Sequence, residues 1–187
     1  MGLMVHSLSE LPAEAHRGYY VYLLDYGWSE PLGEVLSNNF DRMANQASRN
    51  NAVVIRGVVG EHFEDEVLSW HHVNGQQAEN ILPAILVTTK HPHDFRAQEL
   101  APHNAAATHP MLLVPLRDAC KTTADVATLV DRLFVDIRAG KELSNFQIAE
   151  EQRRGKGGAL TDALILRPTI SGVGVDLKKI FKWFTGR

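Results

Sequence analysis

The sequence predicts a mixed α/β fold, because two kinds of apolar pattern alternate along it. Short continuous apolar runs are typical of buried strands, and longer segments with apolar residues at i, i+3, i+4 and i+7 are typical of amphipathic helices. The chain has 187 residues, of which 44% are hydrophobic and 22% are charged. That is enough material for one domain with its own core. It excludes a wholly disordered chain, a collagen-like chain and a disulfide scaffold.

The first predicted strand spans residues 18–25, which are nearly all aromatic or aliphatic. A continuous apolar run is expected where both faces of a strand are covered. A turn and a helix follow. Ser29 can cap the helix, and Pro31 fits its first turn, where the missing N–H costs little. Apolar residues then recur at helical spacing as far as residue 47, so we expect one long helix.

Two more strands are predicted at residues 51–55 and 84–89, with a helix over residues 61–72 between them. The helix carries an apolar stripe that includes His71. We expect this histidine to belong to the core. A role as a base toward Ser29 is the alternative, but neither an oxyanion hole nor a third, orienting group is identifiable.

The fourth predicted strand spans residues 111–116 and contains Pro115. A proline cannot donate to a ladder, so it implies an edge position or a strand end. The clearest helix follows, with Thr122 or Thr123 as its cap and Gly140 at its end. The remaining expected elements are a short helix over 142–153, a basic loop over 153–158, a strand over 163–166 and a closing helix over 176–184.

This order of elements resembles the thioredoxin-like fold, and two turns sharpen the resemblance. Trp28 and Pro31 follow the first strand as in the Trp-Cys-x-Pro-Cys turn of that family. Pro83 opens the third strand, where the family has a cis-proline that faces the turn. The family's two cysteines fall on Ser29 and Leu32. Because thiol–disulfide exchange needs a thiolate, the resemblance implies a member without redox activity.

The resemblance implies a layered α/β domain with a mixed central sheet and a C-terminal strand-helix extension. Residues 1–17 would be a lead-in and residues 18–140 the thioredoxin-like core. Residues 141–187 would be a helical and basic extension, packed on the core or docking from it. A generic layered α/β domain is the alternative interpretation of the same pattern.

In this family the groove between the two turns commonly receives an extended peptide. Here Trp28 would supply a stacking surface, and the backbone beside Pro83 would offer strand-type hydrogen bonds. The expected function is therefore non-catalytic protein binding, as an accessory or scaffold subunit. The predicted partner-binding residues are Trp28, Ser29, Pro31, Pro83, Lys178, Lys179, Phe181, Lys182 and Trp183.

The last predicted helix offers a second contact. Residues 151–187 hold eight Lys or Arg and three Asp or Glu, a net charge of +5, and the rest of the chain has a net charge of −8. Phe181 lies on an apolar stripe and Lys178 on another face. Such a helix can dock into a partner, pair with a second copy or lie on an anionic membrane surface. The alternative is a helix that packs its stripe on its own domain.

The alternative function is enzymatic and depends on histidines. Residues 90–110 contain three prolines and four histidines and are expected to form a loop. His91 and His93 flank a proline that restricts the backbone, and Asp94 follows. Imidazoles and a carboxylate are suitable ligands for zinc or a similar ion, as in a metal-dependent hydrolase or transferase. An exposed polar loop without a cofactor is the simpler interpretation. Further ligands would come from His103 or His109.

Bulk properties narrow the expected partners and location. The net charge of −3 and the pI of about 6.3 give no basic excess, so nucleic acid is not an expected partner. Cys120 is the single cysteine, which excludes an intramolecular disulfide and favours a reducing cytoplasm. The first residues lack a signal-peptide pattern, and no apolar stretch is long enough to cross a membrane.

Overall fold

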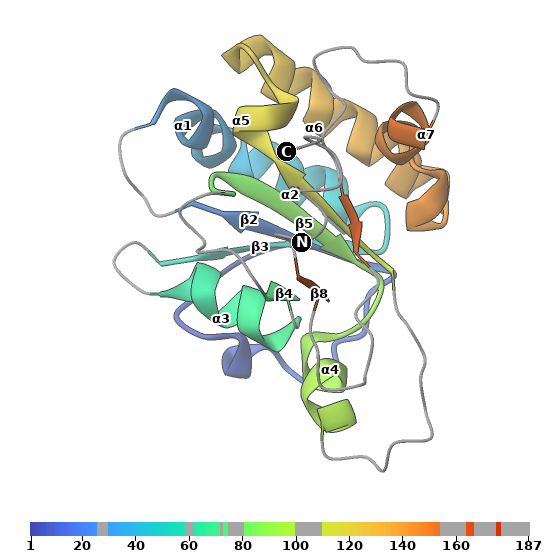
Figure 1. Cartoon of the computed structure of the whole chain (residues 1–187). Helices are drawn as coiled ribbons and strands as arrows, with labels where there is room; N and C mark the ends of the chain where they lie inside the picture. The colour runs from blue at the N-terminus through green and yellow to red at the C-terminus, as the bar shows by residue number, and fades with distance from the viewer. Residues whose placement is uncertain are drawn as a thin grey trace.

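A mixed β-sheet lies between two layers of helices in the computed structural model of this chain (Figure 1). This arrangement confirms the predicted mixed α/β class. One face carries α1 (Pro31–Asn38), α2 (Phe40–Ser48), α5 (Leu116–Ala119), α6 (Thr123–Arg138) and α7 (Gln147–Arg153). The other carries α3 (Phe63–Trp70), α4 (Pro92–Glu99) and the 3-10 turn η1 (Leu8–Glu10). The structure describes residues 1–25, 30–58, 62–71, 73–74, 81–99, 110–153, 164–166 and 175–176.

The main sheet has six strands in the order β1-β3-β2-β5-β6-β7. Strands β1, β3 and β2 pair in parallel, and β2, β5, β6 and β7 pair antiparallel. A separate short ladder pairs β4 with β8 in parallel. The strands are β1 (Gly2–Val5), β2 (Tyr19–Leu24), β3 (Ala52–Gly57), β4 (Val73–Asn74), β5 (Ala84–Thr88), β6 (Met111–Pro115), β7 (Leu164–Leu166) and β8 (Val175–Asp176).

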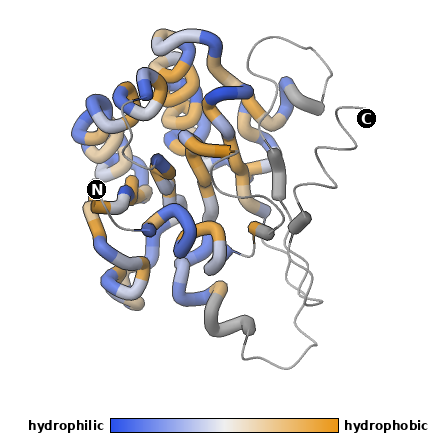
Figure 2. Tube along the Cα trace, turned by 60° about the vertical axis from the view of Figure 1, so that its left-hand side comes forward, coloured by the Kyte–Doolittle hydropathy of each residue, from blue (hydrophilic) through white to orange (hydrophobic). Residues whose placement is uncertain are grey.

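Strand β2 shows why a continuous apolar run forms a central strand. Successive side chains of a strand point to opposite faces. Accordingly, Tyr19, Val21 and Leu23 belong to the core under α1, α2 and α6, and their neighbours in β2 belong to the core under α3. All six side chains are buried, and the central strands are largely apolar in Figure 2. Both faces therefore need apolar residues, as the sequence predicts.

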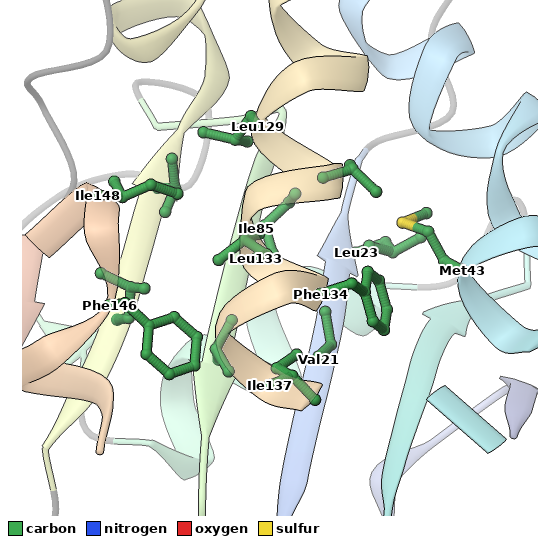
Figure 3. Close-up of a cluster of buried hydrophobic side chains, with 14 of the residues drawn as sticks. Val21, Leu23, Met43, Ile85, Leu129, Leu133, Phe134, Ile137, Phe146 and Ile148 are labelled. Atoms are coloured by element: carbon green, nitrogen blue, oxygen red, sulfur yellow. The ribbon is translucent and has the colours of Figure 1, made fainter. Parts of the chain in front are cut away.

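Helix α6 packs a buried apolar stripe into the core on its face of the sheet. Thr122 caps the helix by accepting a hydrogen bond from the N–H of Asp125, and the Asp125 carboxylate accepts from the N–H of Thr122 in return. Gly140, with φ of +63°, follows the helix end. Both predicted ends are thus confirmed. Figure 3 shows the stripe over β2 and β5, formed by Leu129, Leu133, Phe134 and Ile137.

The segment after α6 is fastened to the core through Asp136, whose side chain is fully buried. Its carboxylate accepts hydrogen bonds from the backbone N–H of Gln147, at 2.6 Å, and from Lys141 Nζ, at 2.7 Å. The carbonyl of Lys141 in turn accepts from the hydroxyl of Tyr19 on β2. These contacts place the 3-10 turn η3 (Leu143–Asn145) and α7 against α6, and Phe146 joins the same core.

Three boundaries differ from the sequence expectations. Residues 31–47 form two helices, because Asn39 adopts a non-helical conformation and its side-chain amide donates to the carbonyl of Val35. Residues 2–5, expected to belong to a lead-in segment, form the edge strand β1 beside β3. Asp176, expected to start a helix over 176–184, lies in β8, and the rest of that expected helix lies outside the described residues.

The expected loop over residues 90–110 is wrong in its first part, which forms α4. Pro92 occupies the first helical position, where a proline is tolerated. Phe95 is buried against the core under α3, and His91 precedes the helix. Apart from Pro92 and Phe95, the described side chains of this helix are the polar His93 and Asp94, so no apolar stripe marks the helix in the sequence. Pro115 is the last residue of β6, as expected of a proline at a strand end.

No helix among the described residues is long and apolar enough to span a membrane.

Candidate functional site

The candidate site lies at the edge of the sheet where β2 ends and β5 begins. Asp25 follows β2, and Glu30 and Pro31 begin α1. The register pairs Leu24 with Ala84, so Pro83 lies beside the end of β2. The structure thus places Asp25, Glu30 and Pro31, which flank the first turn singled out from the sequence, and Pro83 at one edge of the sheet. Trp28 and Ser29, two of the predicted partner-binding residues, lie outside the described residues.

An ion pair connects the start of α1 to α5, the short helix that follows β6. Arg117 Nε donates to Glu30 Oε1 at 2.9 Å, and Arg117 Nη2 donates to Glu30 Oε2 at 2.8 Å. These hydrogen bonds hold the pKa of the Glu30 carboxyl below its ordinary value. The paired guanidinium and carboxylate join the start of α1 to α5 through two hydrogen bonds. Pro31 itself occupies the first helical position and is exposed.

Pro83 is fixed by the residue that precedes Arg117. The N–H of Leu116 donates to the carbonyl of Pro83 at 2.8 Å. Leu116 and Arg117 therefore link the Pro83 turn to the Glu30–Arg117 pair and so to Pro31. The Leu82–Pro83 peptide bond is cis, and the ring of Pro83 is buried. Since proline lacks an N–H and its carbonyl is already engaged, Pro83 shapes this edge without offering a free backbone hydrogen bond of its own.

Two acidic side chains lie at the same edge, and the sequence analysis did not single them out. Glu64 of α3 is only 4% exposed. Its carboxyl lies near that of Asp25, and it accepts a hydrogen bond from the backbone of Asp25. Burial, with the neighbouring Asp25 and Asp65 charges, raises the pKa of Glu64, although backbone hydrogen bonds oppose the shift. Its Oε2 is buried without a hydrogen-bond partner among the described residues.

Local packing makes room for this acidic pair. A Cβ on Gly33 of α1 would overlap the carboxylate of Asp25, so only glycine allows the helix to approach so closely. The sequence does contain a signal for Asp25. It is an acid directly after an apolar strand, followed by a turn and by a helix with glycine in its first turn. A buried carboxyl with a raised pKa keeps its proton to a higher pH than an exposed carboxyl does, and in the protonated form it can donate a hydrogen bond to a bound group.

The predicted metal ligands lie at the opposite end of the sheet. His91 follows β5, whose Thr88 pairs with Tyr20 near the start of β2. The rings of His91 and His93 have centroids 5.1 Å apart, and the exposed ring of His16 is 5.6 Å from that of His91. Among the described residues, no three His, Cys, Asp or Glu side chains are placed to hold a metal ion.

Both ring nitrogens of His91 already have partners. Its Nδ1 accepts a hydrogen bond from the N–H of His93 at 3.2 Å. The ring also bonds to the backbone of Pro12, which has only a carbonyl to offer, so Nε2–H is the donor there. His91 therefore caps α4 and ties it to the lead-in segment, and this arrangement leaves neither nitrogen free for zinc.

The other predicted ligands add little to a metal site. His93 Nε2 is buried without a hydrogen-bond partner in the described part of the chain, and its ring packs against Trp70. Asp94 lies in the first turn of α4. His103 and His109 lie outside the described residues.

His71 is a core histidine, as expected. It is fully buried, its Nδ1 lies 2.7 Å from the carbonyl of Val67, and its ring packs against Tyr22 and Phe95. The predicted C-terminal contact residues lie outside the described residues: Lys178, Lys179, Phe181, Lys182 and Trp183.

Comparison of the chain with protein-family models, with curated proteins and with solved structures found no match.

Proposed function

We propose that this chain is a redox-inactive, thioredoxin-like protein-binding module that acts as an accessory or scaffold subunit. The observation that carries the proposal is the placement of Pro83 beside the end of β2, linked through Leu116 and Arg117 to the start of α1. A thioredoxin-like member requires these two turns to face each other. The succession β2, α1 and α2, β3, α3, β5, β6 and α6 supports the same assignment.

The residues present support binding without dithiol chemistry. Ser29 and Leu32 occupy the places of the family's cysteines, and neither can form a thiolate. Cys120 is buried in the core beneath α6, and burial raises the pKa of its thiol to about 11. A thiol with this pKa is almost entirely protonated at neutral pH, so it is a poor nucleophile.

The proposed partner is an extended protein segment that contacts the exposed start of α1. Pro31 offers an apolar ring on the surface, and the Glu30–Arg117 pair beside it offers polar groups in fixed positions. Trp28 would add a stacking surface. Because the hydrogen-bonding capacity of Pro83 is used within the fold, we assign it to shaping this surface. The basic residues of 153–187 would provide a second contact, to the partner or to a second copy of the chain.

Affinity capture from the native cells tests this proposal. The full chain is compared with Trp28→Ala and Pro31→Ala, and the control is Met4→Ala, which alters an exposed apolar side chain on β1. We expect one stoichiometric protein to co-purify with the full chain and the control and to be reduced at least about tenfold with either test variant, a loss of about 1.4 kcal/mol. Circular dichroism checks that each variant is folded. Equal recovery with all the variants would contradict the proposed surface.

A further inference from the structure

We propose that the depression between α2 and the end of α6 binds a small phosphate ester that carries hydroxyl groups, such as a sugar phosphate or a nucleotide. The depression has a volume of about 880 Å³, within the range of ligand-sized cavities. Its lining residues are all arginines or side-chain amides, and none is acidic. The lining residues are Arg42, Asn45, Gln46, Arg49, Asn50 and Arg138.

The positions of these residues follow from the helical repeat. Arg42, Asn45, Gln46 and Arg49 are spaced i, i+3, i+4 and i+7, which places them on one face of α2. The opposite face of α2 is anchored in the core, where Met43 and Ala47 are buried. The polar face is therefore presented on a fixed helix beside the last turn of α6.

Charge favours an anionic ligand. Arg42 forms an ion pair with Asp131 of α6, but Arg49 and Arg138 have no ion-pair partner among the described residues. Each lies at the C-terminal end of its helix, where a cation compensates the helix dipole. That effect explains one guanidinium at each end. It does not explain why three guanidiniums line one depression when a single carboxylate, that of Asp131, pairs with them. The forked donors of a guanidinium match the oxygens of a phosphate group.

Gln46 indicates that the ligand also carries a hydrogen-bond donor. Its Oε1 is buried and has no hydrogen-bond partner in the described part of the chain, although its backbone carbonyl accepts from Asn50 Nδ2 at 2.6 Å. An unsatisfied buried acceptor is costly. A phosphate group without protons cannot satisfy it, whereas a hydroxyl or amine on the same ligand can. Phosphate and hydroxyl together define the ligand class.

This depression is separate from the surface under Proposed function. Helix α6 begins just after the edge where Pro83 lies and ends, at Arg138, toward the opposite end of the sheet. Helix α2 likewise ends shortly before β3 starts, where Ala52 pairs with Tyr19. The inference therefore stands or fails independently of partner binding.

Isothermal titration calorimetry on the full chain tests the inference. The probes are glucose 6-phosphate, adenosine 5′-monophosphate, inorganic phosphate and a hexaglutamate peptide. The test variants are Arg49→Gln, Arg138→Gln and Gln46→Met. The control is Lys121→Gln, which removes one exposed positive charge ahead of α6 and away from the depression. Thermal unfolding shows whether each variant keeps the fold.

We expect at least one phosphate ester to bind saturably at one site per chain. Each arginine substitution should weaken this binding about tenfold or more, which corresponds to about 1.4 kcal/mol. Gln46→Met should weaken the ester but leave inorganic phosphate unchanged, and Lys121→Gln should change neither. Which ester binds distinguishes a sugar phosphate from a nucleotide.

Three results would overturn the inference. The first is the absence of saturable binding by both esters at millimolar concentration. The second is an equal loss of affinity in Lys121→Gln and the arginine variants, which would indicate diffuse electrostatic attraction. The third is binding of hexaglutamate without ester binding, which would assign the depression to an acidic protein segment.

Discussion

At the scale of single residues, Cys120 tests whether thiol chemistry is absent. The side chain is 3% exposed, and burial raises the pKa of its thiol to about 11. We expect the native protein not to react with iodoacetamide at neutral pH over a period in which the urea-unfolded protein is fully alkylated, since the thiolate is the reactive form. Mass spectrometry measures the modified fraction. Stoichiometric labelling of the native protein at the rate of a free thiol would contradict the inert role.

His91 is expected to make the free energy of unfolding depend on pH. Burial, followed by the neighbouring His93, lowers the pKa of His91 below its ordinary value of 6.5. The unfolded chain therefore takes up this proton at a higher pH than the folded chain does. As the pH falls below about 6.5, the free energy of unfolding should decrease through the range down to the folded-state pKa. Protonation of Nδ1 also removes the acceptor for the N–H of His93.

The substitution His91→Asn separates this effect from other titrating groups. The Asn side-chain oxygen can replace Nδ1 as the cap acceptor of α4, but it does not titrate. We expect the variant to lose less stability than the wild type between neutral and mildly acidic pH, as measured by urea unfolding. His62→Asn is the control, because the side chain of His62 is 90% exposed. Parallel pH profiles for the wild type and His91→Asn would show that His91 is not the responsible group.

At the scale of elements, α6 offers a clean test of a predicted cap. Thr122 and Asp125 exchange side-chain-to-backbone hydrogen bonds at the helix start. Thr122→Ala should lower the free energy of unfolding by about 1 kcal/mol, the usual cost of losing a threonine cap. Thr128→Ala is the matched control. Its hydroxyl donates to the carbonyl of Ala124 within the helix, and alanine has the higher helix propensity. Chemical denaturation compares the two, and equal effects would contradict the capping role.

Elements were predictable from sequence to the extent that they carry a periodic apolar pattern. The strand at residues 19–24 and the helix at residues 123–138 have such patterns and were found. Helix α4 lacks such a pattern, because Phe95 is the one large apolar side chain in its sequence. The periodicity therefore could not predict it. Strand β1 was missed because an edge strand of four residues is too short to show alternation.

The same limit explains what sequence reasoning missed in the candidate site. The two prolines are recognisable by residue type, and Pro83 lies where the sequence placed it. The acidic pair of Asp25 and Glu64 depends on contact between elements distant in sequence, and an acid near a helix N-terminus already has a local explanation. The polar face of α2 likewise shows no sign of a site in the sequence, because the depression forms only where α2 and the end of α6 lie together.

At the scale of the whole molecule, the C-terminal part of the chain is joined to the domain in two places. Strand β7 extends the main sheet by pairing with β6, so residues after α7 contribute to the sheet itself. Strand β8 pairs with β4, where Val73 lies opposite Val175 and Asn74 opposite Asp176. Both pairings join segments far apart in sequence, and the apolar runs alone do not specify their partners.

The β4–β8 ladder predicts a sharp difference between two shortened chains. A chain ending at Asp176 keeps the ladder, whereas one ending at Gly174 lacks the whole of β8. Each backbone hydrogen bond contributes a net of about 0.5–1.5 kcal/mol. We therefore expect the chain ending at Gly174 to have a free energy of unfolding lower by about 1 kcal/mol or more, measured by urea denaturation. Equal stabilities would show that the ladder contributes nothing. If the difference is found, the chain that ends at Asp176 becomes the appropriate test of the basic C-terminal contact. It lacks residues 177–187 but keeps β8.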